Sequence, residues 1–84
     1  MKVQVRYFAS VREALGPGET VELATGTRLS GLRDQLIARG GRHAEALGRG
    51  RALRMALDQA MVDDEAMSVH EGAEVAFFPP VTGG

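Results

Sequence analysis

Residues 3–8 read Val-Gln-Val-Arg-Tyr-Phe, so Val3, Val5 and Tyr7 alternate with Gln4, Arg6 and Phe8. A period of two residues predicts a β-strand with one buried face. Residues 20–23, Thr-Val-Glu-Leu, alternate again after the turn-forming cluster Gly-Pro-Gly at 16–18. The chain is therefore predicted to begin with two strands of a hairpin, with a short helical turn at 11–15 between them.

A helix is predicted next, because apolar residues recur at helical spacing on one face. Thr27 or Ser30 is available as its N-cap, and the glycine pair at 40–41 is a typical terminator. A further helical turn is predicted around 44–47. The apolar stripe that should face the core consists of Leu29, Leu32, Leu36 and Ile37.

Three more strands are predicted in the second half of the chain, at 53–57, 60–62 and 75–78, with a tight turn at 58–59. Two strands, one main helix and three strands give the order ββαβββ. This order favours an α+β domain in which a mixed sheet of about five strands packs on one helix. Such a layout is the β-grasp or ubiquitin-like arrangement, predicted here for residues 1–78.

The composition of 84 residues, with 44% hydrophobic and 25% charged side chains, is typical of one small globular domain. We expect a cytoplasmic protein, because no apolar run could span a membrane and the N-terminal residues alternate as a signal peptide would not. Cysteine is absent, which excludes disulfides and thiolate sites. His43 and His70 lack partners at ligand spacing, so we expect surface histidines and no metal site.

Charge is sorted along the chain: residues 28–54 are basic and residues 55–84 are acidic. The basic run has no interleaved aromatic residues, and the overall pI is near 6.1, so nucleic acid is not expected as a partner. The acidic part is either a solvated face or a surface that steers the domain toward a basic partner.

The C-terminal residues predict an extended tail at 79–84. Two prolines fix φ and lack N–H donors, so they end the last strand and start a stiff segment. Two terminal glycines have no side chains and would therefore pass through a narrow channel. The terminal carboxylate, with a pKa of about 3.3 to 3.7, is ionised at pH 7 and would need activation before it could react. The residues expected to insert into a partner are Pro79, Pro80, Val81, Thr82 and Gly83, with Gly84 carrying the reactive carboxylate.

The period of two also places three large apolar side chains on the outer face of the sheet, away from the helix. Isolated apolar residues are common on surfaces, whereas a contiguous patch beside the departing tail would be a docking site. We predict a partner-docking patch formed by Phe8, Met61 and Phe78.

The opening residues 3–13, with Arg-Tyr-Phe-Ala at 6–9, and the closing residues 74–84, with Phe-Phe-Pro-Pro-Val-Thr-Gly-Gly at 77–84, resemble the small subunits of molybdopterin synthase. The resemblance covers the whole chain. The family's Asn-Gln turn is Asp58-Gln59 here, and its Asp-Gly-Asp-Glu-Val turn is residues 71–75, so the departures fall in turns.

The resemblance implies a sulfur carrier without catalytic side chains of its own. An ATP-dependent enzyme would adenylate the Gly84 carboxylate, and a sulfurtransferase would supply sulfur for a thiocarboxylate. The large subunit would then pass the sulfur to cyclic pyranopterin monophosphate, in a heterotetramer of two small and two large subunits. No stably bound cofactor is implied. Two alternatives remain: a sulfur carrier for thiamine or tRNA thiolation, and a ubiquitin-like protein modifier.

Overall fold

The structure is a computed structural model that describes residues 1–80, which form a five-stranded mixed sheet and three helices. The α+β, β-grasp arrangement predicted from the sequence is confirmed. Two of the predicted helical turns are short helices of seven residues. The strands are β1 (Lys2–Tyr7), β2 (Gly18–Glu22), β3 (Arg54–Leu57), β4 (Ala60–Val62) and β5 (Glu74–Phe78). The helices are α1 (Ala9–Leu15), α2 (Leu29–Ile37) and α3 (Gly41–Leu47).

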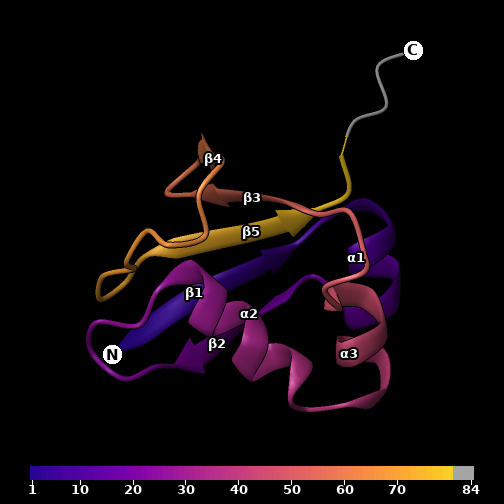
Figure 1. The fold of residues 1–84 in the computed structure, drawn as a ribbon, viewed down its shortest axis with the longest axis horizontal. Coiled ribbons are helices and arrows are strands. Elements are labelled where there is room, and N and C mark those ends of the chain that lie inside the picture. The colour runs from indigo at the N-terminus through magenta and orange to yellow at the C-terminus, as the bar shows by residue number, and fades with distance from the viewer. Residues whose placement is uncertain (81–84) are drawn as a thin grey trace.

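The strands lie in the order β2-β1-β5-β3-β4, so the last strand occupies the centre of the sheet. β1 and β5 are parallel, while the β1–β2, β3–β5 and β3–β4 pairs are antiparallel. Figure 1 shows β5 running beside β1 toward α1, at the end of the sheet opposite the N-terminus. The tail predicted at 79–84 therefore begins next to α1, and only Pro79 and Pro80 of it lie within the described residues.

The core lies on one face of this sheet. Val3, Val5 and Tyr7 of β1 are buried, as are Val75 and Phe77 of β5, which confirms the inward face predicted from their alternation. The helix residues that share this core are Leu29, Leu32 and Leu36. Fully burying one such side chain contributes about 1.5 to 3 kcal/mol, so this cluster is the main source of stability.

The start of α2 differs from the prediction. Neither Thr27 nor Ser30 caps it; the N-cap is Arg28, without a side-chain capping bond, and the Thr27 hydroxyl donates to Ala24 O instead. The N–H groups of the first turn find backbone acceptors in a distant loop: Leu29 N donates to Met67 O and Ser30 N to Glu65 O, both at 2.9 Å. Tertiary contacts thus satisfy the donors that a cap would otherwise serve.

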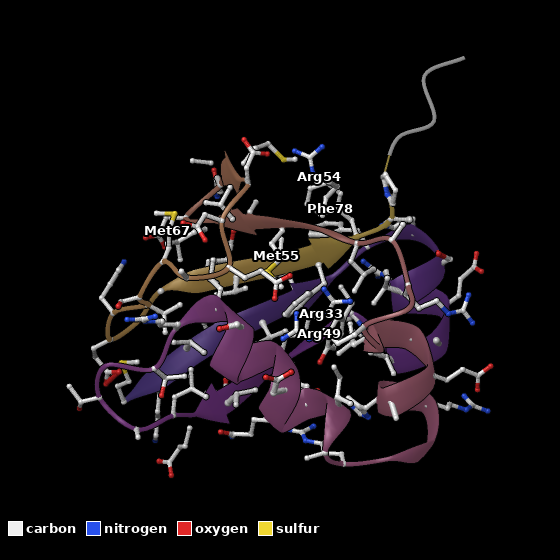
Figure 2. All side chains as sticks on the ribbon, viewed as in Figure 1. Arg33, Arg49, Arg54, Met55, Met67 and Phe78 are labelled. Carbon is white, nitrogen blue, oxygen red and sulfur yellow. The ribbon has the colours of Figure 1, made fainter. Side chains whose placement is uncertain are left out.

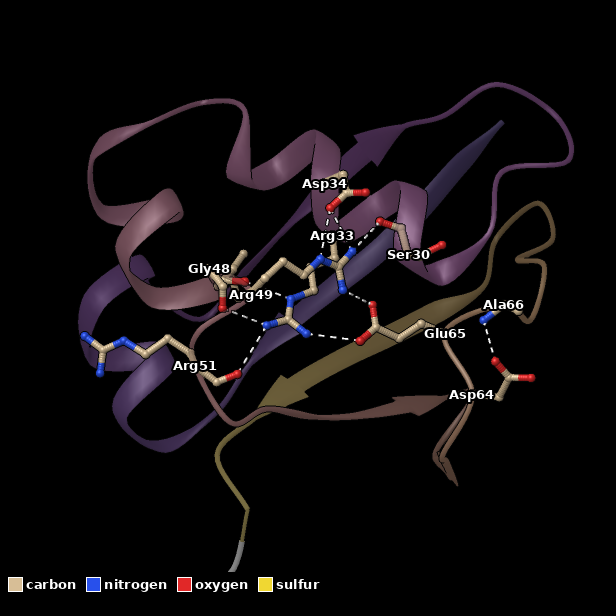
Figure 3. A network of polar contacts seen from close by, with 10 residues as sticks. Ser30, Arg33, Asp34, Gly48, Arg49, Arg51, Asp64, Glu65 and Ala66 are labelled. Carbon is tan, nitrogen blue, oxygen red and sulfur yellow. Dashed lines mark hydrogen bonds and ion pairs between the residues drawn. The ribbon is translucent and has the colours of Figure 1, made fainter.

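A buried arginine joins α2 to the segment that follows α3. The Arg33 side chain is only 5% exposed, and its guanidinium donates to Leu47 O at 2.8 Å, Gly48 O at 2.9 Å and Arg51 O at 3.4 Å. It also pairs with Glu65 at 3.1 Å. Figure 3 shows this arginine beside the exposed Arg49, which contacts Asp34 and Glu65. Arginines from the basic part of the chain thus form ion pairs with Glu65 from the acidic part, so these opposite charges neutralise each other within the fold.

A second polar cluster surrounds the hydroxyl of Tyr7, which donates to Glu19 Oε2 at 2.8 Å. Arg39 and His43 contact the same carboxylate. Burial, followed by the bond to Glu19, raises the pKa of Tyr7 well above its usual value. Burial alone would raise the pKa of Glu19, but hydrogen bonds from Arg39, Tyr7 and His43 outweigh it and lower that pKa. His43, predicted as an ordinary surface residue, is instead half-buried in this cluster.

Replacing Glu19 with Gln should lower the free energy of unfolding by about 1 to 2 kcal/mol at pH 7, since hydrogen bonds to a charged carboxylate are lost. Because folding lowers the pKa of Glu19, its contribution is fully present above the ordinary value of 4.5 and disappears as the pH falls below it. Urea denaturation of both proteins should therefore give a difference that stays constant from pH 7 down to about pH 5 and shrinks as the pH falls below 4.5. Glu22→Gln, an exposed change on the same strand, is the control, and an equal pH-dependent loss there would contradict this assignment.

Candidate functional site

An apolar groove lies on the face of the sheet that the helices leave uncovered. It encloses about 630 Å³, and its floor is formed by Ala56 of β3 and Ala76 of β5, which are paired across the two strands. Two small residues side by side leave the sheet surface hollow between larger neighbours. We call this the apolar groove; it is lined by Phe8, Ala9, Ala56, Gln59, Glu74, Ala76, Phe78, Pro79 and Pro80.

One wall of the groove is Phe8, at the β1–α1 junction. The residue is 41% exposed, and its backbone N–H donates to Phe77 O. The next residue, Ala9, has a φ of 53°, in the left-handed region that alanine seldom adopts. This conformation lets the chain leave β1 and enter α1 at once. The junction therefore fixes Phe8 at the mouth of the groove rather than letting it continue the strand.

The opposite wall comes from the end of β5. Figure 2 shows Phe78 and Arg54 together on the side of the sheet facing away from the helices, while Met55 lies on the helix side. Pro79 and Pro80 also line the apolar groove, so the first two residues of the predicted tail lie at its edge. The chain thus leaves the sheet beside an exposed apolar surface.

Phe8, Met61 and Phe78 share the outer face, as their alternation predicted. Met61 is 53% exposed and is paired with Ala56, the floor residue of the groove, but it is not among the described residues that line the groove. Two of the three residues therefore meet at one groove, and the third extends the same face toward β4. That these residues bind a partner stays a prediction.

The far end of the groove is held by the turn at Asp58 and Gln59, both of which have positive φ. Asp58 accepts hydrogen bonds from the backbone N–H of Glu74 at 3.0 Å and from His70 Nε2 at 2.6 Å. These two contacts, the backbone one first, lower the pKa of Asp58, and the bond to Asp58 raises the pKa of His70. His70 is exposed, as predicted, and links the β3–β4 turn to the segment before β5, while the Glu74 N–H joins that turn to β5 itself.

Among the described residues, no group of three or more histidine, cysteine, aspartate or glutamate side chains could hold a metal ion. The apolar groove offers a binding surface rather than reacting groups. The reactive end predicted at Gly84, and with it Val81, Thr82 and Gly83, lies outside the described residues. No helix within residues 1–80 is long and apolar enough to cross a membrane.

The family model described as the ThiS family matches residues 5–84. The chain belongs to the ThiS family. Its curated relatives include the "Molybdopterin synthase sulfur carrier subunit" of Escherichia coli K12, 41% identical over 83 residues that cover 98% of this chain and 99% of the relative. The protein of the same name from Mycobacterium tuberculosis is 38% identical and covers 100% of this chain and 99% of its own. The resemblance stated from the sequence is confirmed by these relatives.

Two solved structures place this ThiS family chain among known folds. One is a chain from a complex of subunits 1 and 2 of molybdopterin-converting factor from Helicobacter pylori. It is similar to this chain with a TM-score of 0.72 and 25% identity, and the match covers 100% of both chains. SAMP1 from Haloferax volcanii is similar with a TM-score of 0.78 over the full length of both chains. At 20% identity, the second likeness supports the fold alone.

Several site residues could not be identified from the sequence. Ala56 and Ala76 are inconspicuous alanines, and their role follows from strand pairing that joins distant parts of the chain. The one available signal was the small size of both residues at outward positions between large neighbours. Of the charged residues around the start of the tail, Arg42, Glu45 and Arg51 lie within the basic run at 28–54, where no local pattern connects them with the tail, and Glu13 lies in α1.

Proposed function

We propose that this protein is the sulfur carrier subunit of molybdopterin synthase. The observation that carries the proposal is the likeness, over at least 98% of this chain, to curated subunits of that name at up to 41% identity, and the family match extends to the terminal glycine pair. The structure supports it through the position of Pro79 and Pro80 at the edge of the apolar groove, where a partner that receives the tail would meet Phe8 and Phe78.

The chemistry resides at the chain end. A separate adenylating enzyme uses ATP to form an acyl-adenylate on the Gly84 carboxylate, with pyrophosphate leaving. Sulfur supplied by a sulfurtransferase at the sulfide oxidation level, as a hydrosulfide equivalent, then displaces AMP and leaves a thiocarboxylate. We place this ATP-dependent activation in the cytoplasm. The domain itself supplies presentation and docking, and the side chains that act on the substrate belong to its partners.

The large subunit of molybdopterin synthase is the partner proposed for sulfur transfer to cyclic pyranopterin monophosphate, in a heterotetramer of two small and two large subunits. The Helicobacter pylori neighbour is a complex of subunits 1 and 2 of molybdopterin-converting factor, which supports a large-subunit partner here. During transfer the C–S bond of Gly84 breaks and water supplies the oxygen that restores the carboxylate, which can be activated again.

Intact-mass spectrometry tests the proposal. After incubation with the adenylating enzyme, ATP and a sulfur donor, the chain should gain the mass difference between one sulfur and one oxygen atom. The product should convert cyclic pyranopterin monophosphate only when the large subunit is present, and a reaction without ATP is the control. A chain that gains no mass, or that serves thiamine or tRNA thiolation instead, contradicts the proposal, as does conjugation to lysines without sulfur transfer.

Replacing Phe8 with Asp should weaken binding of the large subunit at least about tenfold, because a charge replaces an apolar wall of the groove. Stability should change little, since Phe8 is already 41% exposed. Isothermal titration calorimetry and thermal denaturation measure the two effects. Met67→Asp, at a residue of similar exposure outside the groove, is the matched control. An equal loss of affinity in both variants would contradict the docking role.

A further inference from the structure

A second groove lies on the other side of the tail's first residue, between α1 and α3. It encloses about 680 Å³ and is lined by four charged side chains, whereas Glu74 is the one charged residue among those described that lines the apolar groove. Glu13 comes from α1, Arg42 and Glu45 come from α3, and Arg51 comes from the segment before β3. We call this the polar groove. Pro79 lines both grooves, so the start of the tail separates them.

The four charged residues of the polar groove have no ion-pair partner among the described residues, whereas most arginines in residues 1–80 do. Arg6, Arg33, Arg39, Arg49 and Arg54 each pair with a carboxylate. Within residues 1–80, no ion pair is formed by Glu13, Arg42, Glu45 or Arg51, and all four are exposed. Charges without an internal partner are available to another molecule at low desolvation cost.

Arg51 is nevertheless held in place. Its Nε donates to the backbone carbonyl of Glu45 at 3.1 Å, and its own carbonyl accepts a bond from the buried Arg33. Arg51 is therefore held through the buried Arg33, while Glu13 is carried by α1 and Arg42 and Glu45 are carried by α3. A fixed arrangement of both signs favours recognition of a specific surface over nonspecific attraction.

We propose that the polar groove is a second docking surface for the large subunit, which grips the start of the tail from both sides. The partner would present an acidic group toward Arg42 and Arg51 and a basic group toward Glu13. The inference rests on the proposed function for the identity of the partner. Its physical basis is the continuity of both grooves with Pro79, together with the unpaired charges of both signs.

Two charge reversals test it. Glu13→Lys makes the protein more positive and Arg42→Glu makes it more negative, so a long-range effect of net charge would move the affinity in opposite directions. Local complementarity predicts that both variants weaken large-subunit binding, each by about fivefold or more. Calorimetric titration of each variant, before any sulfur is loaded, measures this directly, and thermal denaturation checks that both variants fold.

Arg28→Glu is the matched control, because Arg28 is exposed, lies at the start of α2 and lines neither groove. Its affinity for the large subunit should stay within about twofold of the parent protein. Unchanged binding of Glu13→Lys and Arg42→Glu, or effects of opposite sign, would overturn the inference. Weakened binding of the adenylating enzyme alone would also overturn it and would assign the groove to that partner.

The outcome can be separated from that of the proposed function. Thiocarboxylate formation by the parent chain is measured without the large subunit, so it tests the carrier role alone. If the parent gains sulfur and binds the large subunit while both reversals bind as tightly as the parent, only the polar-groove inference fails. If the parent gains no sulfur, the proposed function fails first.

Discussion

A variant that lacks Gly84 should lose sulfur transfer completely while its thermal unfolding stays unchanged. The carboxylate that must be adenylated would then sit one residue short of its expected place, whereas the buried residues of the described chain end at Phe77. Chain ends that pack little contribute little to stability. Intact-mass analysis after the activation reaction, together with conversion of cyclic pyranopterin monophosphate, measures the loss.

A variant with one alanine added after Gly84 is the companion to this deletion. It keeps every native residue but moves the carboxylate outward, so it should also fail in sulfur transfer. Both variants should bind the large subunit through the grooves beside Pro79, which separates docking from chemistry. If either supports synthesis at the parent rate, the Gly84 carboxylate is not the carrier.

Arg33→Met should lower the free energy of unfolding by about 2 to 4 kcal/mol. The change removes a buried charged donor from three backbone carbonyls, and each unsatisfied buried acceptor costs about 1 to 3 kcal/mol. The bond to Arg51 O, at 3.4 Å, is the weakest of the three. Urea denaturation at pH 7 gives the measurement.

Arg49→Met is the matched control for this prediction. Arg49 pairs with two carboxylates in the same cluster but is 46% exposed, so its loss should cost less than about 1 kcal/mol. Arg33→Lys should fall between them, because an ammonium group keeps the charge but lacks the planar fork that reaches several carbonyls. Equal losses for Arg33→Met and Arg49→Met would show that the buried carbonyl contacts contribute nothing beyond the ion pair.

The strands and the main helix could be predicted because their patterns are local. Alternation at 3–8 and 75–78 identified the inward faces of β1 and β5, and the leucine spacing identified α2. The start of α2 could not be predicted, since its first N–H groups are satisfied by Glu65 and Met67. No local pattern encodes an acceptor more than thirty residues away.

The candidate site was predicted only in part for the same reason. Phe8, Met61 and Phe78 follow from the period of two, which needs no knowledge of which strands are neighbours. The alanine floor of the apolar groove and the charges of the polar groove require the strand order and the packing of α1 beside α3. Arg33 was counted as one more residue of a basic run, yet it is buried.

The parallel pairing of β1 with β5 has a consequence for biosynthesis. Val5 lies opposite Val75 and Tyr7 opposite Phe77, so the centre of the sheet joins the first and last parts of the described chain. Such long-range contacts form late, because the intervening loop must close first. During translation the sheet must wait for its final strand, and a product that stops before β5 has no centre on which to fold. We therefore expect the chain to become compact only after β5, the strand that leads to the carrier end, has been made.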